Sequence, residues 1–233
     1  MDSRLSFVLF IAMTVLLPVF PGAQQAAHGQ STSSSTSSSS ARRAPKPAAA
    51  RVDAGSVSNG VYRNQSFGFA CKIPAGWVLR TEEMNAQEDE HAKLVGDRST
   101  AAGKTARVLL AAFSRPPQAR GEDVNASILI AAESAEAYPG LKEAAQYFEP
   151  VTAVAQAQGF EVINEPYEFV LGPKTVARSD FQKDVGTRVM WQSTLVVLVR
   201  GYAVSFTFIG GTEDEVEELV EGLSFGVEKP RPH

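Results

Sequence analysis

The segment TRVMWQSTLVVLVRGYAVSFTFIG, residues 187–210, decides the fold because two strand-like runs follow each other across Gly201. Both runs are rich in β-branched and aromatic residues, which favour the extended backbone of a strand. Two earlier runs, FEVINEPYEFVLG (160–172) and KTVARSDFQKD (174–184), are followed by turns at Gly172 and Gly186. Four consecutive strands separated by glycine turns predict an antiparallel meander.

Two more strands are expected upstream of the meander. ARVLLAAFS (106–114) and NASILIAAES (125–134) are nearly continuous apolar runs, which is typical of strands covered on both faces. The segment RPPQARGED between them contains the proline and glycine residues of a loop. The two runs are therefore predicted to pair antiparallel.

The segment FGFACKIPAGW, residues 67–77, contains the only cysteine of the 233-residue chain. Its alternating apolar residues predict a strand with one apolar face, formed by Phe67, Phe69, Cys71 and Ile73. A free thiol in such a face behaves as a small hydrophobic group. A nucleophilic cysteine needs a neighbouring base, and residues 54–233 contain only His91 and His233. Cys71 is therefore predicted to be a structural core residue.

Residues 141–158 predict a helix. Leu141, Phe148 and Val151 recur at helical spacing, and Gly159 follows as a stop signal. Pro150 is expected to kink or divide this helix, because proline lacks a backbone N–H.

A second helix is predicted from about Glu213 to Leu223. Thr212 and Glu215 have the spacing of a capping box, and one apolar stripe follows: Val216, Leu219, Val220 and Leu223. The opposite face is acidic and includes Glu213, Asp214, Glu217, Glu218 and Glu221. This acidic face is interpreted either as an ordinary solvated surface or as a docking surface for a basic partner. Together, the strands and helices predict an α+β fold with helices packed on an antiparallel sheet.

The first 55 residues differ in composition from the rest. Residues 5–20 are an apolar run followed by small residues, so residues 1–23 are predicted to be a signal peptide, the alternative being a retained anchor. Residues 24–55 are rich in Ser, Thr, Ala and Pro and are predicted to be a disordered linker. Residues 56–228 then form a single globular domain, and residues 229–233 are a tail.

These assignments predict an exported protein, periplasmic or extracellular, with no integral membrane span after signal cleavage. Cys71 lies too far from the cleavage site to carry a lipid. The basic residues of the linker are interpreted as solubilising and spacing groups, the alternative being contact with an anionic surface: Arg42, Arg43, Lys46 and Arg51.

Residues 54–233 are acidic, with 17 Lys and Arg against 24 Asp and Glu, a net charge of −7. Nucleic-acid binding relies on clustered basic residues that neutralise phosphates. The composition therefore excludes nucleic acid as the expected partner.

The order of elements resembles the bacterial PsbP-like family, relatives of the extrinsic photosystem subunit. The resemblance covers roughly residues 60–226. It rests on VYRNQSFGFACKIPAGW, with its Phe-Gly-Phe to Pro-Ala-Gly-Trp entry at 67–77, and on RGYAVSFTFIGGTEDEVEELVEGLSF, residues 200–225. It implies an α/β/α sandwich built on a central, mainly antiparallel sheet. Members of this family are mainly accessory or binding proteins, and the matching motifs supply no catalytic residues.

The residues themselves indicate no catalytic, cofactor or metal site. Glu88 and His91 have the Glu-x-x-His spacing of some metal sites, but a single copy favours a solvated segment over residues 81–93. A serine triad would need a histidine in the folded core. The protein is therefore predicted not to be an enzyme and to bind no cofactor.

Two further pairs of residues have a spacing that could form a site. Gly210 and Gly211 precede a helix, as in phosphate-binding loops, but the acidic first turn of that helix would repel phosphate. Arg178 and Asp180 share a strand face and predict a polar patch or a cross-strand ion pair.

Two functions of different classes remain. The first is an exported, non-catalytic accessory or protein-interaction module of the cell envelope, whose partner is an unknown envelope protein. The alternative is a domain that binds a small lipid or other apolar ligand between sheet and helix. Its pocket residues would be Trp77, Tyr147, Phe148 and Trp191, although such aromatic residues are more often plain core.

Overall fold

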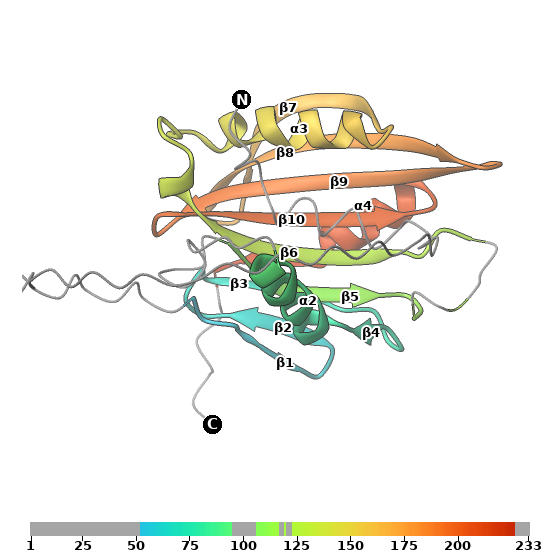
Figure 1. The fold of residues 1–233 in the computed structure, drawn as a ribbon, viewed down its shortest axis with the longest axis horizontal. Coiled ribbons are helices and arrows are strands. Elements are labelled where there is room, and N and C mark those ends of the chain that lie inside the picture. The colour runs from blue at the N-terminus through green and yellow to red at the C-terminus, as the bar shows by residue number, and fades with distance from the viewer. Residues whose placement is uncertain (1–51, 95–105, 117–118, 120–122, 227–233) are drawn as a thin grey trace, which may run out of the picture.

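The computed structural model describes residues 52–94, 106–116, 119 and 123–226. Its largest element is an antiparallel seven-stranded sheet with the strand order β4-β5-β6-β10-β9-β8-β7 (Figure 1). The strands are β4 (Val78–Leu79), β5 (Ala106–Phe113), β6 (Ser127–Ser134), β7 (Glu161–Leu171), β8 (Lys174–Val185), β9 (Arg188–Val199) and β10 (Tyr202–Gly210). The predicted antiparallel pair and the predicted meander are both confirmed.

Two-residue turns connect the strands of the meander. The register pairs Val199 with Tyr202 across the β9–β10 turn, where Arg200 and Gly201 both have positive φ values of 52° and 78°. Two consecutive positive φ values are the signature of a type I′ turn, whose twist matches that of the flanking strands. This turn keeps β9 and β10 in register over their whole shared length.

A second, four-stranded antiparallel sheet has the order β1-β2-β3-β11. It consists of β1 (Ser56–Ser58), β2 (Val61–Asn64), β3 (Phe69–Lys72) and β11 (Leu223–Phe225). β11 closes this small sheet by pairing Phe225 with Phe69 and Leu223 with Cys71. The strand predicted around Cys71 is thus confirmed as β3, but it belongs to a separate sheet that the sequence did not indicate.

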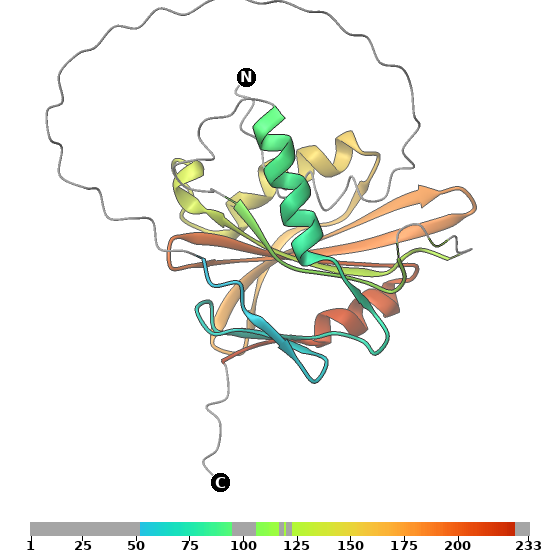
Figure 2. The same cartoon turned by 60° about the horizontal axis from the view of Figure 1, so that its bottom comes forward.

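The large sheet is the central layer of the molecule. Figure 2 shows α2 (Thr81–Leu94) and α3 (Phe148–Ala157) on one face, and α4 (Glu213–Glu221) with the small sheet on the other. The predicted α+β class with a central antiparallel sheet is confirmed. The outer layer next to α4 consists of strands as well as helix.

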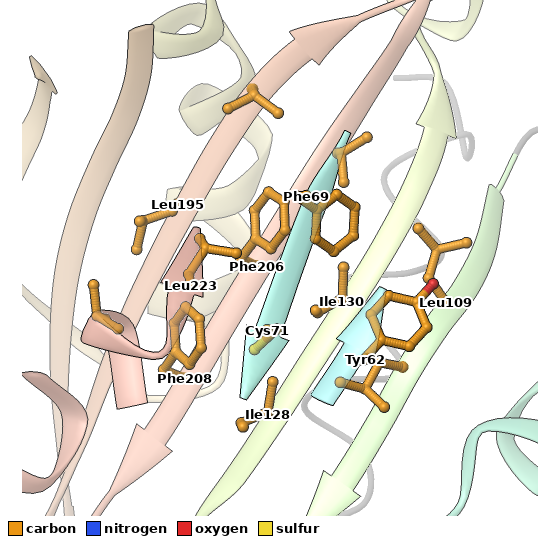
Figure 3. Close-up of a cluster of buried hydrophobic side chains, with 14 of the residues drawn as sticks. Tyr62, Phe69, Cys71, Leu109, Ile128, Ile130, Leu195, Phe206, Phe208 and Leu223 are labelled. Carbon is orange, nitrogen blue, oxygen red and sulfur yellow. The ribbon is translucent and has the colours of Figure 1, made fainter. Parts of the chain in front are cut away.

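The main core lies between the two sheets. Figure 3 shows Phe69, Cys71 and Tyr62 from the small sheet facing Phe206 and Ile130 of the large sheet. The rings of Phe69 and Phe206 meet edge to face with centroids 4.8 Å apart, a favourable geometry for aromatic pairs. Each of these side chains is buried.

Cys71 is completely buried in this core. Burial in an apolar environment disfavours the thiolate and raises the pKa of Cys71 to about 12. The structure therefore confirms the prediction that this cysteine is a core residue.

The helix predicted over 141–158 is divided into two elements. A 3₁₀ turn, η3 (Ala144–Tyr147), precedes α3, and Pro150 lies in the first turn of α3. The first turn of a helix has no intrahelical partner for its N–H groups, so proline fits there without a kink. A further 3₁₀ turn, η2 (Ala135–Ala137), follows β6.

The segment 81–93, predicted to be solvated, forms most of α2, and its described side chains other than Met84 are exposed or half-buried. Met84 is buried against β5 and β6 with Val108 and Phe113. The side chain of Asn85 donates to the carbonyl oxygen of Val108 over 2.9 Å and accepts from its N–H over 3.2 Å. Val108 lies at the irregularity in the β5–β6 register, so Asn85 satisfies backbone groups that the strand partner leaves open.

The described residues begin at Val52, within the predicted linker. Val52 packs against the main core, and the carbonyl oxygen of Asp53 accepts a 2.8 Å hydrogen bond from Asn64. The predicted signal peptide, the linker up to residue 51 and the C-terminal tail lie outside the described residues. No described helix has the length and apolar character needed to cross a membrane.

Candidate functional site

The acidic helix α4 starts with a well-formed cap. Thr212 Oγ1 accepts a 3.1 Å hydrogen bond from the N–H of Glu215, and Glu215 Oε2 accepts a 2.7 Å bond from the N–H of Gly211. These contacts satisfy backbone donors at the helix start and place carboxylates where the helix dipole favours them. The Gly211 amide, which a phosphate loop would need, already binds the chain's own carboxylate.

The apolar side of α4 holds it on the sheet. Val216, Leu219 and Val220 are buried in the main core. The predicted surface residues divide into two groups as a result. Four are exposed, namely Glu213, Asp214, Glu218 and Glu221, whereas Glu217 is half-buried and turned toward the sheet.

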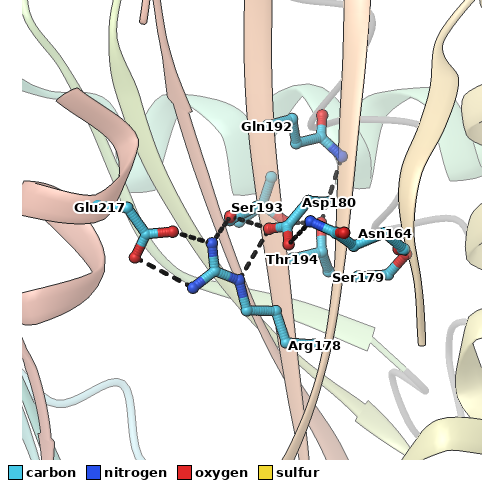
Figure 4. Close-up of polar contacts among 9 residues, drawn as sticks. Asn164, Arg178, Ser179, Asp180, Gln192, Ser193, Thr194 and Glu217 are labelled. Atoms are coloured by element: carbon cyan, nitrogen blue, oxygen red, sulfur yellow. Dashed lines mark hydrogen bonds and ion pairs between the residues drawn. The ribbon is translucent and has the colours of Figure 1, made fainter. Parts of the chain in front are cut away.

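Glu217 forms a two-point ion pair with Arg178 of β8 (Figure 4). Its Oε2 accepts from Arg178 Nη1 over 3.1 Å, and its Oε1 accepts from Nη2. The planar fork of arginine fits a carboxylate in this bidentate arrangement. The contact adds a polar link between α4 and the sheet beside the apolar contact of Val216.

Arg178 also holds Asp180, two residues further along β8. Arg178 Nε donates to Asp180 Oδ1 over 2.8 Å, and Arg178 Nη2 donates to Ser193 Oγ over 2.8 Å. Asp180 further accepts from Ser193 Oγ and, over 3.1 Å, from Asn164 Nδ2. The predicted polar patch is therefore a connected network that spans β7, β8, β9 and α4.

The network keeps its arginine charged. Burial alone would lower the pKa of Arg178, but the hydrogen bonds that it donates to Glu217 and Asp180 outweigh this effect and raise the pKa above its usual value. Tyr167 on β7 lies within reach of the same charges, and burial is the main cause that raises its pKa.

A shallow depression lies over this network. It has a volume of about 10 Å³ and is lined by Asn164, Arg178, Asp180, Trp191, Gln192, Ser193, Glu213, Val216 and Glu217. A volume of this size holds about one water molecule, whereas sites for small organic ligands are larger by more than an order of magnitude. The depression is suited to a surface contact rather than to enclosing a ligand.

The four aromatic residues predicted to line a ligand pocket do not meet. Tyr147, at the end of η3, and Phe148, at the start of α3, are buried against one face of the large sheet. Trp77 and Trp191 pack against the core between the two sheets, on the opposite face. Because the sheet separates the two pairs, they form parts of two cores and not one pocket.

A buried carboxylate on β6 was missed by the sequence interpretation. Glu133 is only 5% exposed, and its Oε2 accepts 2.6 Å hydrogen bonds from both Tyr138 and Tyr147. Burial raises the pKa of Glu133, and the two tyrosine hydroxyls oppose that effect. Glu133 is a charged residue within the apolar run NASILIAAES, and this pattern could have indicated a buried carboxylate.

No group of three or more metal-ligating side chains occurs among the described residues. Glu88 lies on α2 as the helical spacing suggested, and the side chain of His91 lies outside the described residues.

Comparisons with known proteins give only remote structural similarities. No family model and no curated protein matches the chain. Cyanobacterial PsbP from Synechocystis sp. PCC 6803 is 15% identical with a TM-score of 0.40, over 71% of this chain and 91% of its own. The yeast Ran-binding protein Mog1p is 12% identical with a TM-score of 0.39, over 73% and 96% of the two chains.

LpqN, involved in cell envelope biogenesis of Mycobacterium tuberculosis, is 13% identical with a TM-score of 0.36. This similarity covers 68% of this chain and 83% of LpqN. Values this low assign neither a family nor a function to the chain, and the PsbP-like resemblance stays an expectation from the motifs.

Proposed function

We infer that the protein is an exported, non-catalytic interaction module that binds a basic surface of an envelope partner through the acidic face of α4. The observation that carries this proposal is the anchoring of α4. Its apolar stripe and the ion pair between Glu217 and Arg178 fix the helix on the sheet. The exposed carboxylates are thereby presented at constant spacing: Glu213, Asp214, Glu218 and Glu221.

A fixed array of like charges favours a complementary partner. Because α4 is already held on the sheet, its backbone loses little further freedom when a partner binds. Less of the interaction energy is then spent on ordering the helix. Complementary charge also raises the rate of association and suppresses contacts with acidic surfaces. In this proposal the segment before Val52 serves as a spacer, as its composition predicts.

The test is capture of the full-length protein with its partner after cross-linking in its native cells, identified by mass spectrometry. A variant neutralises the four exposed positions with Glu213→Gln, Asp214→Asn, Glu218→Gln and Glu221→Gln. The matched control removes four charges elsewhere on the surface, with Glu82→Gln, Glu90→Gln, Glu136→Gln and Glu149→Gln, all of them at exposed positions.

The proposal expects a defined partner that is retained by the control and lost by the α4 variant. Both variants should unfold at similar temperatures, because neither set is buried. The affinity for the purified partner should fall as salt is raised from about 50 to about 300 mM, since salt screens exposed charges. Equal recovery by the α4 variant and the control would refute the role of this surface.

A further inference from the structure

The outer edge of β7 is the longest unpaired strand edge among the described residues. β7 has 11 residues and ends the large sheet on one side (Figure 1). The opposite edge strand, β4, has two residues, and the edge strands of the small sheet, β1 and β11, have three each. Short edges are a common protection against unwanted pairing, and β7 lacks that protection.

The first half of β7 is protected in another way. Its register with β8 shifts between Val162 and Asn164 and again between Asn164 and Tyr167, and Pro166 lies in the second interval. Bulges bend a strand, and proline removes a hydrogen-bond donor, so both discourage a further strand from pairing there. The second half, from Tyr167 to Leu171, pairs with β8 without interruption.

Backbone groups in this second half point away from β8. Leu171 pairs with Lys174 across a two-residue turn, which makes it a hydrogen-bonded pair in the usual hairpin. Because hydrogen bonding alternates along an antiparallel pair, the N–H and C=O groups of Glu168 and Val170 face outward. They form the donor and acceptor pattern that an added strand requires.

The side chains along this edge are apolar and acidic. Val170 is 73% exposed and Tyr167 is 41% exposed, and they lie on opposite faces of the strand. The exposed charged residues of β7 are Glu161, Glu165 and Glu168, and the strand has no basic residue. An incoming strand with alternating apolar and basic side chains can place its basic residues on the face of Glu168 and Val170 and its apolar residues on the face of Tyr167. The basic groups would then offset the carboxylate of Glu168, their aliphatic stems would cover Val170, and the apolar residues would cover Tyr167.

We propose that the Tyr167–Leu171 edge of β7 accepts an extended segment of a basic, apolar partner polypeptide as an additional strand. A second copy of this chain fits less well, since pairing two β7 edges would gather their glutamates on one seam. The inference goes beyond the proposed function of α4, because it concerns a different element and a different mode of contact.

The test uses a capped, fluorescently labelled peptide in which valine and lysine alternate, with an alternating valine and glutamate peptide as the control. Binding to the full-length protein is followed by fluorescence anisotropy. Amide hydrogen exchange of the protein is measured with and without the peptide. The proposal expects binding of the basic peptide alone and slowed exchange of the Glu168 and Val170 amides, which become hydrogen bonded.

Two variants at one position separate backbone pairing from side-chain contact. Val170→Pro removes an outward N–H that β8 does not use, and Val170→Thr keeps that N–H. Val170→Pro should weaken peptide binding by about tenfold or more, because it removes a donor and obstructs pairing. Val170→Thr should bind within about threefold of the original protein, since the backbone pattern is kept.

The α4 variant described above distinguishes the two proposed surfaces. It should bind the basic peptide as the original protein does. Loss of binding in the α4 variant together with unchanged binding by Val170→Pro would overturn the β7 proposal. Unchanged amide exchange at Glu168 and Val170 in the presence of the peptide would also overturn it. A concentration-dependent dimer in sedimentation equilibrium that Val170→Pro abolishes would overturn it too, because a second copy would then be the occupant.

Discussion

Arg178 on β8 and Glu217 on α4, 39 residues apart in the chain, form a bidentate ion pair that joins the acidic helix to the sheet. Arg178 also carries the charge that balances Asp180, which is buried. One guanidinium therefore connects a surface helix to a carboxylate in the interior. The two carboxylates differ in exposure, since the side chain of Glu217 is 43% exposed and that of Asp180 is 9% exposed.

This difference predicts that removing Arg178 costs more stability than removing Glu217. Arg178→Met leaves Asp180 buried without its cation and should lower the free energy of unfolding by about 3–5 kcal/mol. Glu217→Gln keeps a hydrogen-bond acceptor at a partly exposed position and should cost about 1 kcal/mol. Urea unfolding followed by tryptophan fluorescence measures both. An Arg178→Met protein as stable as the Glu217→Gln protein would contradict the central role of Arg178.

Glu133 predicts a pH dependence of stability. Burial raises its pKa in the folded state, so the folded protein binds this proton more tightly than the unfolded chain. The contribution of Glu133 to stability is complete below its unfolded pKa, near 4.5, and is lost as the pH rises through its folded pKa. Glu133→Gln removes the ionisation, so the unfolding free energy of the variant should decline less over that interval.

Thermal and urea unfolding between about pH 4 and pH 8 can test this effect of Glu133. Glu136→Gln is the matched control, because Glu136 is close in sequence and exposed. Its stability should follow the pH profile of the original protein. Parallel profiles for the Glu133→Gln and Glu136→Gln proteins would show that Glu133 does not titrate over this range.

Cys71 should be unreactive in the folded protein. Its burial and its pKa of about 12 leave almost no accessible thiolate at neutral pH. Iodoacetamide labelling at pH 8 should be negligible without denaturant and complete in guanidinium chloride, as read by mass spectrometry of the intact chain. Rapid labelling without denaturant would place the thiol at the surface and contradict the assigned core.

Alanine substitutions at two turn glycines are expected to lower the stability by different amounts. Gly172 and Gly186 have φ values of 60° and 65°, so alanine is strained at either position by about 1 kcal/mol. A Cβ atom at Gly172 would also lie 3.1 Å from the carbonyl oxygen of Phe225, whereas a Cβ at Gly186 meets nothing within 4 Å. Gly172→Ala should therefore lower the unfolding free energy more than Gly186→Ala. Equal losses of unfolding free energy in urea would show that the β7–β8 turn is not in close contact with β11.

Local patterns in the sequence determined most of the strands and the acidic helix. The meander follows from β-branched runs and glycine turns, and α4 follows from the Thr212–Glu215 cap and its apolar stripe. These features are local because turn geometry and helix capping depend on residues that are close in the chain. The apolar alternation around Cys71 likewise predicted β3 and its buried face.

Only the tertiary structure decided which distant segments meet. β11 joins β3 through Phe225 and Phe69, and no local pattern encodes a pairing between segments at opposite ends of the fold. Tertiary packing likewise joins Arg178 to Glu217, 39 residues later, and Glu133 to Tyr147, 14 residues later. Four aromatic residues were also predicted to line one pocket, but the layering of the elements puts Tyr147 and Phe148 on one face of the large sheet and the two tryptophans on the other. Strand periodicity identifies a face, but the packing of whole elements decides what covers it.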